Sequence, residues 1–138
     1  MINRYVYLIL LVIIASCCWC GTHSKTKIED QDSKFSSFNE MVAIFKGFEE
    51  IVEKNKNNPK LGVEKCRSYN KENIPKLKTI DDEIGTLRKN SAYLSSIVET
   101  NREIQKITDN VTKIATDYYG IEGAEILMQL SDLVLARF

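Results

Sequence analysis

The sequence predicts an all-α protein, a bundle of four to five helices behind a short N-terminal targeting segment. After residue 34, apolar residues recur at spacings of three and four along most of the chain. The 138 residues include only two prolines and six glycines, which is unlike a collagen-like or turn-dense chain. No stretch has the alternation and hairpin turns typical of strands. We place one helical domain at residues 35–138.

The first predicted helix begins near Phe35 and fades in the Lys/Asn-rich run 54–58, because proline at 59 disfavours helical backbone before it. One face carries apolar residues at helical spacing: Phe35, Phe38, Met41, Val42, Phe45, Phe48, Ile51 and Val52. We interpret Phe38, Phe45 and Phe48 as core anchors. The alternative is that they form an exposed interaction face for a protein partner.

Residues 60–72 predict a second, shorter helix that carries Leu61, Val63, Cys66 and Tyr69 on its apolar side. Asparagines at 70 and 73 followed by Pro75 indicate a turn or a kink. Proline is tolerated in the first turn of a helix, so a new helix is expected to start near this point.

From residue 77 to 118 the helical spacing continues for about 42 residues, which would measure about 63 Å as one helix. Such a rod is longer than a compact domain of this size. We therefore expect a break near Lys89-Asn90-Ser91 that folds the segment into a hairpin. An unbroken coiled-coil rod is the alternative, which Gly85 and the polar seam residues Ser91 and Asn101 disfavour.

The last predicted helix follows a turn around Gly120 and Gly123. Residues 124–137 have an amphipathic pattern, with an apolar side formed by Ile126, Leu127, Leu130, Leu133 and Val134. Together the segments predict helices whose apolar faces meet in one core.

Residues 1–16 predict an export signal. Arg4 precedes an uncharged apolar run at residues 5–15, which matches a signal peptide core of about 7 to 15 residues. A membrane-spanning helix needs about 20 apolar residues, so a permanent anchor is the less favoured reading.

The end of this run, Ile14-Ala15-Ser16-Cys17, resembles the lipobox of bacterial lipoproteins: an aliphatic residue, two small residues and a cysteine. The resemblance covers the first 17 residues and implies that a lipid is joined to the Cys17 thiol and the signal is cut before it. Cys18 stands where Asp would imply retention at the inner membrane, so outer-membrane sorting is implied for a Gram-negative cell. The alternative is plain secretion after a cut elsewhere, for example after Cys20.

The segment 17–34 would then consist of the lipidated cysteine and a polar, mixed-charge tether from residue 21. The Lys/Asn run before Pro59 and the later Cys66 also resemble, in composition, small helical lipoproteins of an uncharacterised family. We expect Cys66 to pack as a small apolar residue. A disulfide to Cys18 or Cys20 in an oxidising compartment is the alternative.

The composition favours no enzyme class. Basic and acidic residues number 19 each, and this balance argues against a general nucleic-acid binder. The one histidine, His23, lies in the expected tether, and no phosphate loop or zinc motif is present in the sequence. We interpret Asp81-Asp82-Glu83 as a solvated helix face. No catalytic, metal or cofactor residue is nominated.

The sequence therefore predicts a non-enzymatic helical protein that a lipid anchors in the cell envelope. It would act through contacts with an unknown protein partner, as an adaptor, assembly helper or inhibitor. The alternative function is a secreted helical protein that binds an apolar small molecule between its helices.

Overall fold

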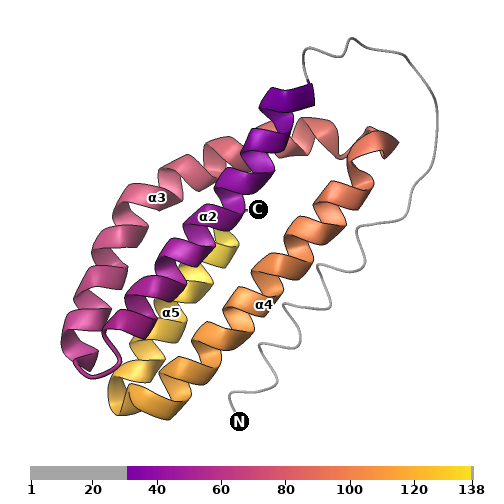
Figure 1. Ribbon diagram of the computed structural model, residues 1–138. Helices are drawn as coiled ribbons and strands as arrows, with labels where there is room; N and C mark the ends of the chain where they lie inside the picture. The colour runs from indigo at the N-terminus through magenta and orange to yellow at the C-terminus, as the bar shows by residue number, and fades with distance from the viewer. Residues whose placement is uncertain (1–30, 138) are drawn as a thin grey trace.

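The computed structural model describes residues 31–137 and contains four long helices joined by short turns (Figure 1). Helix α2 spans Gln31–Lys54, α3 spans Pro59–Leu87, α4 spans Leu94–Tyr118 and α5 spans Gly123–Leu135. Two 3₁₀ turns, Ser91–Tyr93 and Gly120–Glu122, precede α4 and α5. No strand occurs in the described part of the chain, and the predicted all-α bundle is confirmed.

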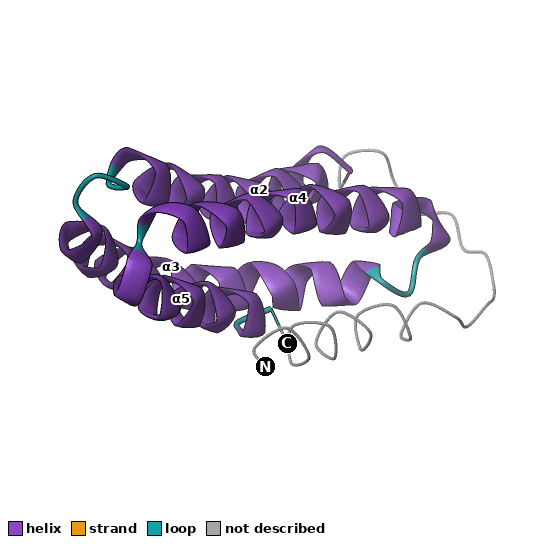
Figure 2. Ribbon diagram, turned by 90° about the horizontal axis from the view of Figure 1, so that it is seen from below, coloured by secondary structure: helices purple, strands orange, loops and turns teal. Residues whose placement is uncertain are grey.

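The helices form two layers, with α2 beside α4 and α3 beside α5 (Figure 2). Helix α2 packs against α3 and α4, and α5 packs against the same two helices. Consequently α3 and α4 lie across the diagonal of the bundle. Neighbours within a layer run parallel and neighbours in different layers run antiparallel, as the course of the chain in Figure 1 shows.

Helix α3 is continuous where the sequence suggested a turn. It runs through Pro75 to Leu87 and is visibly bent in Figure 1. The asparagines that indicated a turn are buried inside the helix, where their amide nitrogens donate hydrogen bonds, whereas Asn70 Oδ1 has no partner among the described residues. Asn70 Nδ2 donates to the Gln129 carbonyl oxygen (2.6 Å) and Asn73 Nδ2 to the Tyr69 carbonyl oxygen (2.9 Å). Burial on both sides of Pro75 outweighs the hydrogen bond that the proline removes.

The break expected near Lys89-Asn90-Ser91 is confirmed, and the unbroken rod is wrong. Helix α3 ends at Leu87, and the side chain of Asn90 accepts a hydrogen bond from the Ala92 N–H (3.0 Å). An asparagine at this position satisfies a backbone donor before the next helix. The two helices are nevertheless not adjacent arms of a hairpin, because the link between them crosses the bundle diagonally.

The other helix boundaries agree with the sequence to within a few residues. Helix α2 ends at Lys54 as expected but begins at Gln31, so residues 31–34 of the expected tether are helical. Helix α3 begins at Pro59 behind the N-cap Asn58, whose side chain accepts from the Leu61 N–H (3.4 Å). Gly120 adopts a positive φ of 53°, which favours glycine at the turn before α5.

Two tyrosines outside α2 donate hydrogen bonds to backbone carbonyls of α2. Tyr69 donates its hydroxyl to the Ile44 carbonyl (2.9 Å), and Tyr119 donates to the Val52 carbonyl (2.7 Å). Gly62 on α3 leaves room for the Tyr119 ring, since a Cβ there would lie 2.7 Å from Cε1 and 2.9 Å from Cζ. Tyr119 is therefore held by its hydroxyl at one end and by a close helix contact along its ring.

Helix α5 is the short member of the bundle. Its 13 residues measure about 20 Å, against about 38 Å for the 25 residues of α4. Where α5 ends, the buried Arg137 donates to Asn101 Oδ1 (2.5 Å) and lies over the Phe45 ring, 5.8 Å from its centroid. Burial lowers the pKa of Arg137 to about 10, while the charge of Asp81 acts in the opposite direction. The core of the bundle thus ends here at a buried cation, Arg137, whose charge is only partly compensated.

Candidate interaction surface

The phenylalanines named as a candidate interaction face lie in the core. Phe38 is 4% exposed, and Phe45 and Phe48 are fully buried between α2 and its neighbours. The interpretation as core anchors is therefore confirmed, and these side chains form no exposed face in the described structure. The predicted lipidation site, Cys17, lies outside the described residues, as do the tether residues before Gln31.

The clearest exposed apolar line instead follows α5. Ile121 is 87% exposed, Met128 51% and Leu135 54%. Residues seven apart lie on the same side of a helix, so Met128 and Leu135 are aligned, and Ile121 precedes them in the 3₁₀ turn. We call Ile121, Met128 and Leu135, with the small residues Ala124 and Ser131 between them, the α5 face.

The composition of α5 explains why this face exists. The opposite side of the helix is also apolar, since Ile126, Leu130 and Leu133 are buried in the core. Helix α5 is therefore apolar on two opposite sides, and only one of them is covered by the other helices. The apolar side predicted from the sequence consists of Ile126, Leu127, Leu130, Leu133 and Val134, which are buried or half-buried. The missed signal was Met128 and Leu135 on the other side.

The flank of the α5 face next to α3 is charged. Arg67 on α3 forms an ion pair with Glu125 of α5 (3.0 Å). The hydrogen bond from Arg67 holds the pKa of Glu125 below its ordinary value, with a further hydrogen bond from Gln129. Asp132 is exposed and lies seven residues after Glu125, on the same flank.

On the flank next to α4, the α4 side chains nearest to α5 are uncharged. Asn101 accepts from Arg137 and so marks the side of α4 that faces α5. Thr108 and Thr112 share this side, at seven and eleven residues from Asn101. Their hydroxyls donate to the carbonyls of Gln105 and Thr108 (both 2.8 Å). Because these hydroxyls are used within the helix, the methyl groups add to the apolar surface beside α5.

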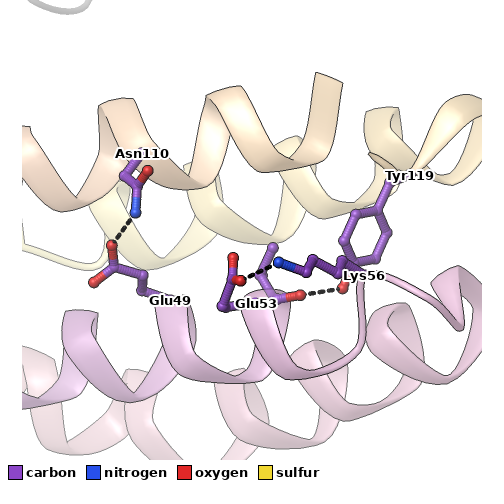
Figure 3. A network of polar contacts seen from close by, with 6 residues as sticks. Glu49, Glu53, Lys56, Asn110 and Tyr119 are labelled. Atoms are coloured by element: carbon purple, nitrogen blue, oxygen red, sulfur yellow. Dashed lines mark hydrogen bonds and ion pairs between the residues drawn. The ribbon is translucent and has the colours of Figure 1, made fainter. Parts of the chain in front are cut away.

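The polar contacts of α4 concentrate on its other side, towards α2 (Figure 3). Asn110 Nδ2 donates to Glu49 Oε1 (2.6 Å). Seven residues earlier on α4, Glu103 forms an ion pair with Lys46 of α2 (2.6 Å). Figure 3 also shows Lys56 paired with Glu53 near the hydroxyl contact of Tyr119. Charged and uncharged sides of α4 are therefore separated, and the uncharged side adjoins the α5 face.

A second exposed apolar pair, Leu94 and Val98, lies at the start of α4. These side chains line a shallow depression together with Ser95, Glu99 and Arg102. Val98 is 50% exposed, almost the same as Met128. The depression contains a charge of each sign and belongs to a single helix, so it is a smaller and more polar surface than the α5 face.

Asp81 departs from the expected solvated face. Its side chain is only 17% exposed and pairs with Arg88 (2.9 Å), and burial raises its pKa. Asp82 and Glu83 are exposed as expected, and Glu83 accepts a hydrogen bond from Ser37 on α2 (2.7 Å). Nothing in the local sequence distinguishes Asp81 from its two acidic neighbours, because its burial depends on contacts between helices.

Cys66 is fully buried as a free thiol, in line with the apolar-packing interpretation. Burial raises the pKa of its thiol to about 12. Reaction with a cysteine elsewhere in the chain would require this part of α3 to open first. The structure therefore assigns Cys66 to packing between α3 and the residues around Tyr119.

Within residues 31–137, no three or more His, Cys, Asp or Glu side chains are grouped so as to hold a metal ion. No helix among these residues has the length and apolar character needed to cross a membrane. No protein-family model, curated protein or solved structure matches the chain.

Proposed function

We propose that this chain is a lipid-anchored, non-enzymatic helical protein of the cell envelope that acts through protein contacts made by the α5 face. The anchoring part rests on the lipobox-like residues Ile14-Ala15-Ser16-Cys17. The contact part rests on one observation, the exposed apolar line Ile121, Met128 and Leu135 on the outside of α5.

An exposed apolar helix side favours binding because covering it removes apolar area from water, worth about 25 cal/mol per Å². Monomeric proteins rarely keep such contiguous surfaces unless they have a use. The uncharged flank formed by Thr108 and Thr112 extends the surface without placing a charge in it. An adaptor, an assembly helper and an inhibitor all need a surface of this kind.

The anchoring part is tested by the mass of the N-terminal peptide from protein extracted from whole membranes. The proposal expects a chain that starts at Cys17 with added acyl mass. The variant Cys17→Ala is the matched control and should remain unacylated and uncut at this site. A chain that starts later, without a lipid, and is found in the medium would overturn the anchoring and favour the secreted alternative. A chain that starts at Met1 would indicate an uncleaved anchor.

The contact part is tested by a photo-reactive amino acid placed at Met128 in the full chain. Val98 is the matched control position, because its exposure is almost equal and it lies on α4. The proposal expects protein adducts from position 128 in excess of those from position 98. Equal and low adduct yields at both positions would contradict a contact through the α5 face.

A further inference from the structure

We infer that the outer side of α3 lies on a membrane surface of anionic phospholipids, through basic side chains between residues 60 and 78. The inference rests on the anchoring part of the proposed function, which brings the chain to a membrane, and it adds how the helical domain is oriented there. We call these six side chains the α3 band: Lys60, Lys65, Arg67, Lys71, Lys76 and Lys78.

Positive charge is concentrated in the α3 band. Its six basic side chains share residues 60–78 with two acidic ones, Glu64 and Glu72, which leaves this stretch with a net charge of +4. In α2, α4 and α5 the acidic residues outnumber the basic ones. The electrostatic attraction of the described chain for an anionic surface is therefore greatest along this part of α3.

The cations of the α3 band are little used within the fold. All six side chains are exposed. Among residues 31–137, only Arg67 of the six takes part in an ion pair, and its side chain is still 63% exposed. On α2, by contrast, Lys46 and Lys54 are both paired with glutamates. The band thus directs most of its charge outwards.

Four of the cations form a line on the side of α3 towards α5. Arg67 marks this side, because it pairs with Glu125 of α5. Lys60 lies seven residues before Arg67, and Lys71 and Lys78 lie four and eleven residues after it, so all four share one side of the helix. The line extends over 18 residues, or about 27 Å.

The other two cations lie on the opposite flank of α3, towards α2. Glu83 marks this flank, because it accepts a hydrogen bond from Ser37 of α2 (2.7 Å). Lys76 and Lys65 lie seven and 18 residues before Glu83, on the same side of the helix. The exposed Ser68 lies between the two flanks, on an outer ridge that has cations along both edges.

The spacing of these charges favours a surface of many headgroups over a single ligand. Cations spread over about 27 Å of a convex helix cannot converge on one phosphate group. The attraction of lysines to anionic headgroups adds over the charges and needs no fixed geometry. The two acidic residues in the stretch reduce this attraction without reversing its sign. A membrane surface therefore suits the band.

The position of the band is compatible with attachment through Cys17. The 14 residue steps from Cys17 to Gln31 span at most about 46 Å, which exceeds the length of α2, about 36 Å. An attached bundle therefore has room to lie along the membrane. Helix α3 lies across the bundle from α4 (Figure 1). With α3 on the membrane, α4 points away from it and the α5 face points sideways, where a protein can reach it.

The first test places a photo-reactive amino acid at position 68 or at position 95 of the full chain in membranes, and measures lipid adducts by mass spectrometry. Both positions hold exposed serines, Ser68 on the ridge of α3 and Ser95 at the start of α4. Because α2 and α4 run parallel, Ser95 lies at the end of the bundle where α2 starts (Figure 1). A domain standing on that end would favour position 95. The inference expects several-fold more lipid adducts from position 68, enriched in anionic phospholipids.

The outcomes separate this inference from the proposed function. More lipid adducts from position 95, or equal yields from both positions, would overturn it. Protein adducts in place of lipid adducts at position 68 would also overturn it and indicate an acidic protein partner. The N-terminal peptide mass of the same sample reports the anchor. An acylated chain without an excess at position 68 would refute the inference alone, whereas an excess in an unacylated chain would support it and refute the anchoring.

A matched pair of double variants tests the role of charge, with the photo-reactive residue at position 68. Lys71→Gln with Lys78→Gln removes two charges of the α3 band, and Lys106→Gln with Lys113→Gln removes two lysines of α4 at the same spacing. One basic residue near an anionic surface strengthens attachment by about fivefold. The first pair should therefore lower the ratio of attached to detached domain by up to about 25-fold, and the second pair should leave it unchanged. Circular dichroism checks that both remain helical.

Vesicle composition gives the last readout for the same proteins. Lipid adducts from position 68 should be abundant in phosphatidylcholine mixed with phosphatidylglycerol, and should fall in phosphatidylcholine alone or at raised salt, which screens the charges. An adduct yield that does not depend on lipid charge, or an equal loss from both double variants, would show that the α3 band does not bind an anionic surface.

Discussion

Replacing Gly62 with alanine should destabilise the fold, whereas the same change at Gly85 in the same helix should stabilise it. Alanine in place of glycine inside a helix is worth about 1 kcal/mol. A Cβ at Gly85 meets nothing within 4 Å, so this gain is expected in full. A Cβ at Gly62 would lie 2.7 Å from Cε1 of Tyr119, which is 1% exposed and has no space to move into.

The size of the loss at Gly62 follows from the contacts of Tyr119. Overpacking a dense core costs about 1 to 3 kcal/mol, and disturbing the hydrogen bond to the Val52 carbonyl costs about 0.5 to 1.5 kcal/mol more. After subtraction of the helix-propensity gain of about 1 kcal/mol, the free energy of unfolding should fall by about 0.5 to 3.5 kcal/mol. The hydrogen bond from the Tyr119 hydroxyl to the Val52 carbonyl, which this estimate includes, measures 2.7 Å.

Urea unfolding followed by circular dichroism measures both variants against the unchanged chain. The Tyr119→Phe background adds a second readout, because the phenol oxygen is among the atoms closest to the added Cβ. In that background Gly62→Ala should cost less than in the unchanged chain, since contacting residues are not additive. Equal stabilisation by Gly62→Ala and Gly85→Ala would refute the packing described around Tyr119.

Four further expectations follow from single side chains. Phe45→Ala should lower the free energy of unfolding by about 3 to 5 kcal/mol in urea unfolding, and a loss below 1 kcal/mol would contradict its place in the core. Arg137→Met should leave stability unchanged or raise it by up to about 3 kcal/mol, because it removes a poorly paired buried charge; a Tm drop would refute this. Cys66 should resist alkylation at pH 8 in the folded protein and react once urea unfolds it, as peptide mass reports, since its thiol pKa is about 12; rapid labelling of the folded state would count against its burial. Glu125 has a lowered pKa, so its contribution to stability is present above the unfolded pKa and is lost as the pH falls through the folded one. NMR titration should find a higher Glu125 pKa in Arg67→Met than in the unchanged chain, and an equal value would contradict the ion pair.

The helix ends could be predicted where local chemistry decides them. Pro59 and the residues before it end α2, Asn90 caps the turn before α4, and Gly120 takes a positive φ. These signals act over a few residues and are visible in the sequence.

The features that were missed depend on contacts between distant segments. Pro75 does not end α3, because residues on both sides of it are buried against other helices. Asn70, for example, reaches Gln129 on α5, and this partner is invisible from the local sequence. Phe45 and Met128 show that the local sequence does not determine whether an apolar side chain is buried. Both are apolar residues on a helix, and only the positions of the neighbouring helices decide that one is covered and the other exposed.

The diagonal link between α3 and α4 has a consequence for the order in which the chain can fold. Because α2 and α4 share a layer, their contacts join residues far apart in sequence, such as Glu49 with Asn110, 61 positions on. Val52 and Tyr119 are separated by 67 positions. Bundles with such distant pairs fold more slowly than bundles of successive hairpins, because a long loop must close before any contact compensates for it. A nascent chain that ends before residue 94 can pair α2 with α3 and place Phe48 against Tyr69, but the side of α2 that faces α4 then stays uncovered.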